Sequence, residues 1–332
     1  MKRVPLGNTG IDVSIIGMGG HEYMADGRSR GFNEDRVKSL TPGYIFPDFG
    51  GEQRLKVLKT AYDNGINLFD VTQDSEKEAL GRNLRNNPPP YEVYIQTRPE
   101  QMAYGYDKFN LRLANLELLR AEVQRINTLM GIERLDFLNV PPLKWAFDHD
   151  PDYLDKIGYN IAALKKEGLI RFASADTFSG TEIYRRMIES GHFDVIYINF
   201  NFGDYTPGDV IIPLAAEKGM GVIIREVFMK GDLFKMTAEA GVDSAAAAAA
   251  AVRWAVSRNG VSTAFYGTGK VNHLLDVCKA VETGFSPEDD ALLDKIRRTP
   301  MFKTYENRRI DEFKGLVERM DLLFVPDHLR TY

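Results

Sequence analysis

The sequence predicts an α/β fold of the (β/α)8 TIM-barrel type, preceded by a β-hairpin and followed by a helical extension. Amphipathic helical patterns alternate with short apolar strand patterns, and eight such units fit into about 270 residues. The chain of 332 residues is large enough for one barrel. A doubly wound sheet, the competing architecture, would place a Gly-x-Gly-x-x-Gly turn after its first strand. Gly17-Met18-Gly19-Gly20 lacks the last glycine and leads into a loop, so we favour the barrel.

The N-terminal part predicts a hairpin and the first barrel strand. Residues 2–14 contain two short extended pieces around the turn-rich tetrapeptide Gly7-Asn8-Thr9-Gly10. Residues 13–18 then have the pattern of a buried strand. Residues 26–51 are polar, with glycines, prolines and aromatic residues but no periodicity. A connection of this length is usually a functional lid or a mobile segment, and we expect one or the other.

The remaining units follow from alternating periodicities. Leu55, Leu58, Ala61 and Tyr62 fall on one helical face before the second barrel strand. Further strands are predicted at 67–70, 93–97, 135–140, 170–175, 194–200, 221–225 and 263–267. The helices after them are predicted at 75–84, 113–130, 152–167, 180–190, 208–218, 243–257 and 271–281. The first of these has a capping-box pattern, Ser75 with Glu78. We therefore expect one domain, with a hairpin (2–14), a barrel (13–283) and a C-terminal extension (286–332).

Composition excludes several classes of protein. The net charge is −5 without a basic block, so an electrostatic footprint for nucleic acid is lacking. A single cysteine, Cys278, excludes an internal disulfide and any all-cysteine metal or iron–sulfur site. Residues 1–7 contain no apolar core of signal-peptide length, and the longest apolar run, 245–252, is too short to span a bilayer. We expect a cytoplasmic protein that binds a small molecule, with no membrane partner. The oligomeric state stays open.

Several short motifs occur along the chain in a fixed order. They are Arg3-x-x-Leu6-Gly7-x-Thr9-Gly10, Gly65-Ile66-Asn67-Leu68-Phe69-Asp70, Ser75-Glu76 with Leu80-Gly81, Ile170-Arg171, Ala251-Val252-Arg253-Trp254, and Tyr266-Gly267-Thr268-Gly269-Lys270-Val271. Through these motifs the chain resembles the aldo/keto reductase superfamily from residue 2 to about residue 283. The resemblance implies a (β/α)8 barrel that binds NADP(H) across its mouth and reduces aldehydes or ketones.

The resemblance also implies four catalytic residues, of which one is present. The family's aspartate corresponds to Asp70. Its tyrosine belongs to the loop before Ser75, but here that loop, 71–74, is three residues shorter and contains no tyrosine. The lysine position holds Arg98 and the histidine position holds Pro141. We therefore expect a divergent member whose usual catalytic tetrad is degenerate.

The missing phenol removes the family's standard mechanism. Carbonyl reduction needs an acid that protonates the developing alkoxide, and a phenol of pKa about 10 needs a nearby cation to do so. Arg98 could pair with Asp70 through its fork, but a guanidinium of pKa above about 12 releases no proton. His21 and Tyr23, which follow the first barrel strand, are the candidate proton donors. Glu226 and Asp74 are further possibilities, and a structural role for His21 stays open.

Candidate ligand-binding residues come partly from the resemblance. It places Asp176 and Thr177 where the family holds the nicotinamide amide, although a two-residue shift would put Ser174 there. Lys270 stands where an adenosine 2′-phosphate could meet a helix N-terminus. The other candidates for the cofactor are Gly267, Thr268 and Arg225, although Arg225 and Glu226 could equally form a local ion pair. For the substrate they are Asn139, Asn199, Asn201 and Glu226, of which Asn199 and Asn201 alternate with apolar residues and should point into the mouth.

Three functional hypotheses remain. The first is an NADP(H)-dependent oxidoreductase acting on a polar or sugar-derived carbonyl or alcohol. The second is a non-catalytic sensor or partner subunit, and the third is a lyase or isomerase that uses Asp70, Arg98, His21 and Glu226. The fold alone cannot separate them, because barrels carry unrelated chemistries on one scaffold. No metal site is expected, since no recognisable ligand spacing occurs.

Overall fold

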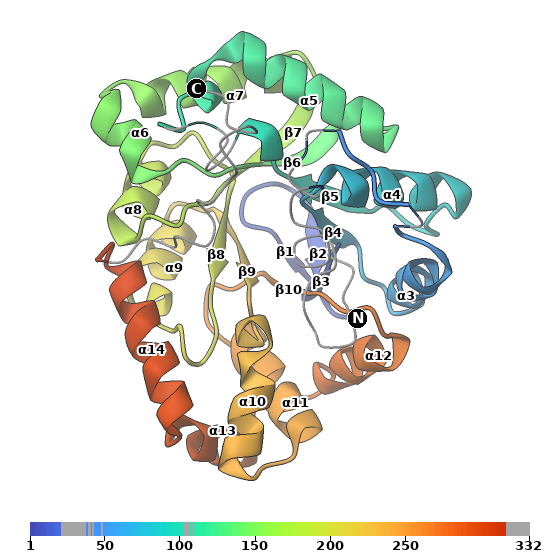
Figure 1. Ribbon diagram of the computed structural model, residues 1–332, viewed down its shortest axis with the longest axis vertical. Coiled ribbons are helices and arrows are strands. Elements are labelled where there is room, and N and C mark those ends of the chain that lie inside the picture. Colours follow the sequence, from blue (N-terminus) through green and yellow to red (C-terminus); the bar gives the residue numbers. More distant parts are fainter. Residues whose placement is uncertain are drawn as a thin grey trace.

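The computed structural model describes residues 1–20, 38, 41, 43–47, 49–102, 107 and 109–316. Eight parallel strands form a closed barrel in the order β10-β3-β4-β5-β6-β7-β8-β9 (Figure 1). The strands are β3 (Ile16–Gly19), β4 (Leu68–Val71), β5 (Tyr94–Thr97), β6 (Leu135–Val140), β7 (Ile170–Ala175), β8 (Val195–Asn199), β9 (Gly221–Arg225) and β10 (Thr263–Tyr266). The predicted (β/α)8 barrel is confirmed.

Helices surround the barrel. The ring consists of α3 (Glu52–Asp63), α4 (Asp74–Asn86), α5 (Leu116–Met130), α7 (Tyr153–Lys166), α8 (Thr181–Glu189), α9 (Pro207–Glu217), α11 (Ser244–Val256) and α12 (Val271–Ala280). Additional helices are α6 (Lys144–His149), α10 (Asp232–Ala240), α13 (Pro287–Arg297) and α14 (Pro300–Phe313). In the part of the chain that the structure describes, no helix is long and apolar enough to cross a membrane.

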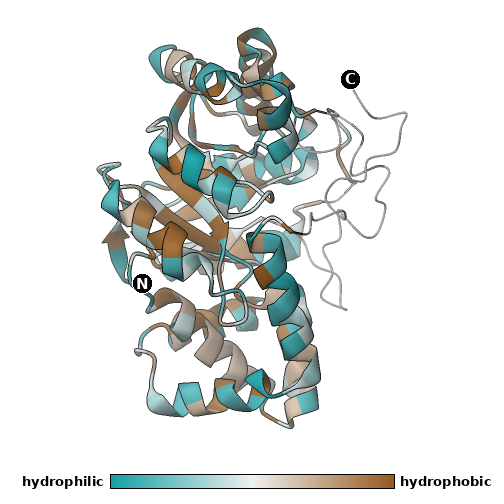
Figure 2. Ribbon diagram, turned by 90° about the vertical axis from the view of Figure 1, so that its left-hand side faces the viewer, coloured by the Kyte–Doolittle hydropathy of each residue, from teal (hydrophilic) through white to brown (hydrophobic). Residues whose placement is uncertain are grey.

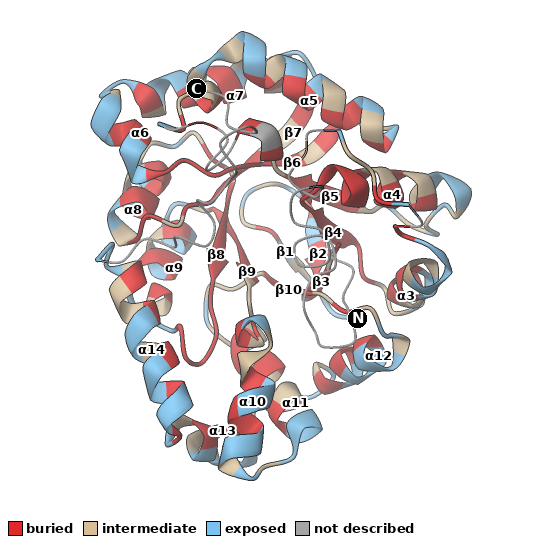
Figure 3. Ribbon diagram, in the orientation of Figure 1, coloured by how far each residue is buried: buried red, intermediate tan, exposed pale blue. Residues whose placement is uncertain are grey.

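The core has two shells, one between strands and helices and one inside the barrel. The larger shell packs helix residues such as Val57, Ile126 and Leu164 against the outward side chains of the strands. Figure 3 shows the buried strands and the exposed outer faces of the helices, and in Figure 2 the helices carry hydrophobic as well as hydrophilic residues. The inner shell contains Leu68 and Phe137. The barrel is therefore a packed core, and only its ends are available for a site.

A hairpin closes the amino-terminal end of the barrel. β1 (Arg3–Pro5) pairs with β2 (Asp12–Ser14) in antiparallel register, as the sequence predicts. Leu6, beside its turn, is fully buried in the inner shell. Gly7 has φ +54, and a Cβ there would lie 2.2 Å from the backbone nitrogen of Gly221, so only glycine fits this approach. With this end plugged, the carboxyl ends of the strands form the only mouth in the described barrel.

The predicted strand at 13–18 is two strands, β2 and β3, with Ile15 between them. Ser14 causes the break, because its Oγ donates to the carbonyl of Ile16 at 2.7 Å and its N–H donates to Oδ1 of Asn67 at 2.8 Å. These bonds turn the backbone from the hairpin into the barrel. A straight strand would leave the buried Asn67 amide without this partner.

The helix after β4 begins one residue earlier than predicted, at Asp74. Its capping carboxylate is Glu76, which accepts from the N–H groups of Thr72 at 2.8 Å and Gln73 at 3.0 Å. The predicted pair of Ser75 and Glu78 does not cap it, because β4 extends to Val71 and leaves a connection of only two residues. Asp74 pairs with Arg125 of α5 through two bonds of 2.9 Å, so it lies between helices.

Candidate active site

A chain of hydrogen bonds crosses the barrel at the level of Asp70. The carboxylate of Asp70 accepts from Nε2 of Gln96 at 3.2 Å through Oδ1, and from the hydroxyl of Tyr197 at 3.1 Å through Oδ2. Oε1 of Gln96 in turn accepts from Oγ of Ser174 at 2.7 Å. The four side chains come from β4, β5, β7 and β8. They meet because inward-facing positions of a closed barrel share one layer.

Arg98 follows Gln96 by two residues and pairs with a local carboxylate. Its guanidinium donates through Nε and Nη2 to Glu100, and both side chains are largely buried. Among the described residues, Gln96 and Tyr197 donate to Asp70 and Arg98 forms an ion pair with Glu100. The pairing of Arg98 with Asp70 stays a prediction.

A second polar cluster surrounds Asp176 at the end of β7. Arg225 binds both carboxylate oxygens, Nη1 at 2.8 Å and Nη2 at 2.7 Å, and its Nε donates to Oδ1 of Asn199 at 2.6 Å. Nδ2 of Asn139 donates to Asp176 at 3.3 Å. Tyr184 donates its hydroxyl to the carbonyl of Tyr197 at 2.9 Å and lies 3.4 Å from Asp176. Asp176, Arg225, Asn139 and Asn199, all sequence candidates, are thus brought together in one charge-neutral network.

Arg225 also connects the two clusters. Its guanidinium carbon lies 4.3 Å from the ring centre of Tyr197 and 4.8 Å from that of Phe178. Burial, followed by the nearby charge of Asp70, raises the pKa of Tyr197 well above its ordinary value, while Arg225 opposes this rise. The phenol therefore stays protonated at neutral pH and serves as a fixed donor to Asp70.

Asn201 and Glu226 shape the loops beside the mouth. Nδ2 of Asn201 donates to the carbonyl of Glu226 at 2.9 Å and to the hydroxyl of Tyr305 at 3.1 Å. Its Oδ1 accepts from the N–H groups of Gly203 and Asp204, each at 2.9 Å. Glu226 has φ +61, a strained conformation for a non-glycine residue. Asn199 and Asn201 therefore differ: the first joins the central network, and the second organises a loop.

The predicted cofactor loop at 267–270 is held against α3. Arg54 donates to the carbonyl of Thr268 at 3.3 Å, and Gln53 donates to that of Gly269 at 2.9 Å. Oγ1 of Thr268 accepts from the N–H of Lys270 at 3.1 Å. Lys270 is exposed at the N-terminus of α12. An ammonium group beside a helix N-terminus fits an anionic ligand such as a phosphate of a dinucleotide.

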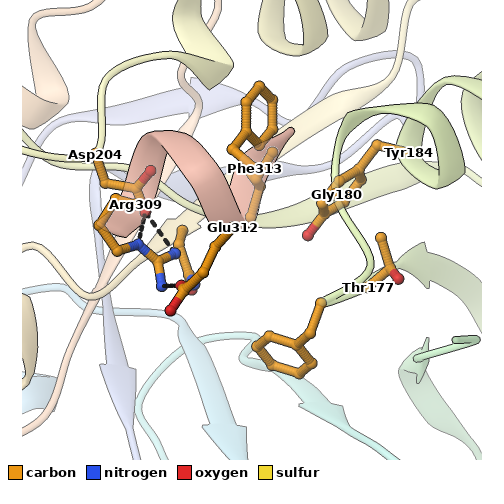
Figure 4. A pocket seen from close by; sticks show the side chains of 10 residues that line it. Thr177, Gly180, Tyr184, Asp204, Arg309, Glu312 and Phe313 are labelled. Atoms are coloured by element: carbon orange, nitrogen blue, oxygen red, sulfur yellow. Dashed lines mark hydrogen bonds and ion pairs between the residues drawn. The ribbon is translucent and has the colours of Figure 1, made fainter. Parts of the chain in front are cut away.

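A small pocket adjoins Asn199 under the C-terminal extension (Figure 4). Its empty volume is about 330 Å³, part of it open to solvent, and α14 contributes Arg309, Glu312 and Phe313 to its wall. Arg309 binds Asp204 at 2.6 Å and also contacts Glu312. Thr177, a predicted cofactor residue, lines this pocket and donates its hydroxyl to the carbonyl of Pro142 at 2.7 Å. Polar and apolar side chains thus both line this pocket, which shares Asn199 with the network around Asp176.

The sequence predicts some residues of the site and misses others. His21 and Tyr23 lie outside the described residues, as does most of the 26–51 segment. Gln96 and Tyr197 were missed by sequence reasoning. Tyr197 lies two positions before Asn199 on the same strand, so the two-residue period of a strand already placed it on the inward face. Gln96 likewise lies two positions before Arg98. The family motifs point to neither Gln96 nor Tyr197, because neither position belongs to the family's catalytic tetrad.

Comparisons with known proteins agree with this architecture. A family model described as the aldo/keto reductase family matches residues 48–246, more than half of the chain. The NADH-specific methylglyoxal reductase of Escherichia coli (strain K12) is 24% identical over 246 residues, which cover 70% of this chain and 68% of that protein.

Two solved structures are similar in fold. The glycerol dehydrogenase of Gluconobacter oxydans superposes with a TM-score of 0.65 at 18% identity, covering 90% of this chain and 96% of that one. An aldo-keto reductase from Bacillus halodurans in its holo form superposes with a TM-score of 0.64 at 16% identity, covering 89% and 96%. At such identities the likeness concerns the fold alone.

Proposed function

The chain belongs to the aldo/keto reductase family, a family of oxidoreductases, and from this premise we propose that it interconverts a polar carbonyl compound and its alcohol with NADP(H). A bound nicotinamide ring supplies or accepts the hydride at the carbonyl carbon. The protein's own part is to bind the substrate, orient it and exchange the proton. The proposed substrate class is hydroxyl-rich, such as a sugar derivative.

The polar lining of the mouth is the observation that carries this proposal. Side chains that offer both donors and acceptors occupy the inward positions at the ends of six strands: Asp70, Gln96, Asn139, Asp176, Asn199 and Arg225. Gln96, Asn139 and Asp176 are buried and bonded within this network, so Asp70, Asn199 and Arg225 are the members nearer to a ligand. Hydroxyl groups of a substrate would extend such a polar network.

Lys270 supports the choice of NADP(H) over NAD(H). Its exposed ammonium group precedes α12, where it could pair with the additional phosphate of NADPH. The name of the Escherichia coli relative states specificity for NADH, so the preference needs its own test in this chain. Gly267, Thr268 and Thr177 complete the proposed contacts with the cofactor.

A thermal-shift titration with NADPH, NADP+, NADH and NAD+ tests the cofactor proposal. A ligand at 100 times its dissociation constant adds about 2.7 kcal/mol to the free energy of unfolding, so NADPH should raise the melting temperature. We expect Lys270→Ala to weaken NADPH binding about tenfold, an effect of about 1.4 kcal/mol, and to leave NADH binding unchanged. Lys279→Ala, at the other end of the same helix, is the matched control and should change neither.

Two results would contradict the proposal. If Lys270→Ala weakened the binding of NADPH and of NADH equally, Lys270 would not be the residue that pairs with the additional phosphate of NADPH. Absence of a shift with any dinucleotide at millimolar concentration would remove the redox proposal and favour a sensor, a lyase or an isomerase.

His21 and Tyr23 remain the proposed proton donors for the reductive direction. Comparison of His21→Ala and Tyr23→Phe over a panel of polar aldehydes and ketones tests this role. Turnover should fall at least about 100-fold in the variant that lacks the donor, which is the usual contribution of a positioned general acid. Unchanged turnover in both variants would place the donor elsewhere.

A further inference from the structure

The chain contains two Asn-Gly pairs, at 64–65 and at 259–260, and the structure surrounds them differently. Asparagine is a thermolabile residue, and one that precedes glycine loses ammonia most readily, because glycine lets the backbone bend towards the side chain and has no Cβ in the way. We propose that Asn259 is a deamidation site of the folded protein and that the fold protects Asn64 from the same reaction. The modification does not depend on the proposed redox function.

Asn259 and Gly260 are the central residues of a turn between α11 and β10. The N–H of Val261 donates to the carbonyl of Arg258 at 3.2 Å, and Gly260 has φ +86, as glycine does at the third position of a type II turn. Asn259 is exposed to solvent. Within the described part of the chain, no hydrogen bond joins its side-chain amide or the N–H of Gly260 to another residue. Neither of the two reacting groups is therefore engaged.

Asn64 directly follows α3, and both of the corresponding groups are held there. Its Nδ2 donates to the carbonyl of Thr60 at 2.8 Å, and the N–H of Gly65 donates to the carbonyl of Tyr62 at 2.9 Å. The first bond holds the side chain against its own helix, and the second holds the nitrogen that would attack. Both bonds must break before Asn64 can react, whereas the same two groups at Asn259 have no such bonds to lose.

The proposed step balances with water as the co-reactant, and no atom is oxidised or reduced. The backbone nitrogen of Gly260 gives its proton to solvent and attacks Cγ of Asn259, so that a C–N bond forms. The bond between Cγ and Nδ2 breaks, and the nitrogen takes up a proton from solvent and leaves as ammonia. Water then opens the resulting five-membered imide. Opening at the side-chain carbonyl gives aspartate, and opening at the backbone carbonyl gives isoaspartate.

Both products carry a carboxylate in place of the amide, so they add one negative charge to the net charge of −5. Isoaspartate also lengthens the main chain by one methylene group. The turn leads into β10, whose Thr263 and Ala264 pair with Ile223 and Ile224 of β9. The change therefore falls at the entry to the strand that lies between β9 and β3 and closes the barrel. The added charge separates the modified chain from the original one by ion exchange.

Incubation of the folded full-length protein at pH 8, followed by digestion at acidic pH and peptide mapping by mass spectrometry, tests the inference. We expect Asn259 to be converted at least about tenfold faster than Asn64, a difference of about 1.4 kcal/mol, because two hydrogen bonds hold the groups at Asn64. In concentrated urea the two rates should become similar, since the fold no longer distinguishes the two pairs. Asn259→Gln, whose longer side chain would have to close a larger ring, should slow the appearance of the more negative species in ion exchange. Asn64→Gln is the matched control and should leave it unchanged.

Three results would overturn the inference. Equal conversion of Asn64 and Asn259 in the folded protein would show that the fold protects neither. A difference that persists unchanged in urea would show that the neighbouring sequence causes it and the structure does not. Wild-type accumulation of the more negative species in Asn259→Gln would place the modification at another residue. None of these measurements involves a dinucleotide, so their outcome is separate from that of the proposed function.

Discussion

At the scale of single residues, two buried aspartates show how surroundings set acidity in this protein. For Asp74, burial favours the neutral form, but the charges of Lys77 and Arg125 outweigh it and lower the pKa to about 2. For Asp204, burial dominates over the pairing with Arg309 and raises the pKa to about 6. The ionised carboxylate of Asp74 therefore stabilises the fold at neutral pH. The carboxyl of Asp204 instead favours the fold at low pH, where it is protonated.

Asp74 provides a prediction about acid stability. Its folded pKa of about 2 lies below the ordinary value of 3.8, so its contribution is present above about pH 4 and is lost as the pH falls through 2. This shift of the pKa by about two units corresponds to about 2–3 kcal/mol. Asp74→Asn should lose this amount at pH 7 and only about a third of it at pH 2.5, measured by urea unfolding. Asp209→Asn, at an exposed position, should change neither value. An equal loss at both pH values would contradict the assignment.

At the scale of elements, the Leu80-Gly81 motif has a packing explanation. Gly81 lies on α4 against the C-terminal end of α5, and a Cβ there would lie 2.1 Å from the carbonyl oxygen of Met130. The two helices can pack this closely only because Gly81 has no side chain. The motif that identifies the family at this position is thus a requirement of helix packing and carries no catalytic information.

This contact predicts a large effect from a single methyl group. Gly81→Ala should lower the free energy of unfolding by about 1–3 kcal/mol, since overpacking forces α4 and α5 apart, although alanine favours helices. Thermal unfolding followed by circular dichroism measures the change. Gly284→Ala has open space around its Cβ and is the control. A stability of Gly81→Ala equal to that of the control would show that the helices tolerate the separation.

The sequence predicts where most strands lie along the chain, but it does not predict which distant residues bond to each other. Strands such as β6, β7 and β9 follow directly from short apolar runs, because a strand buried on both faces has few other compositions. The division at Ile15 was missed because it depends on Asn67, which is 53 residues away from Ser14. The bond between Tyr197 and Asp70 joins residues 127 positions apart. Closure of the barrel determines which distant residues become partners, and a local sequence pattern does not contain this information.

At the scale of the whole molecule, the hairpin connects the N-terminus to the centre of the barrel. Leu6 packs in the inner shell with Leu68, Phe137 and Ile223, which come from three different strands. The N-terminal segment is thus part of the core, and the extension contributes Leu293, Ile296 and Phe302 to the larger shell. Both observations support our proposal that hairpin, barrel and extension form one domain. One cooperative unfolding transition is expected for such a unit.

The variant Leu6→Ala tests whether the protein unfolds in one cooperative transition. Removing a fully buried leucine side chain should cost about 2–5 kcal/mol, and the loss should appear in every probe together. Far-ultraviolet circular dichroism and the fluorescence of Trp145 and Trp254, on α6 and α11, should report the same midpoint in urea. Leu275→Ala, at a position that is 45% exposed, is the control. Separate transitions for the two probes would indicate more than one folding unit.

The bonds from α3 to the loop before α12 also have a consequence for synthesis. Arg54 and Gln53 bind carbonyl groups that follow them by 214 and 216 residues. At ribosomal rates of about 5–20 residues per second, these partners emerge roughly 10–40 seconds apart. During that interval the edge of β3 that will pair with β10 has no neighbour. The nascent chain therefore carries an open sheet edge until its last quarter is made, and this period is when chaperones can protect it from aggregation.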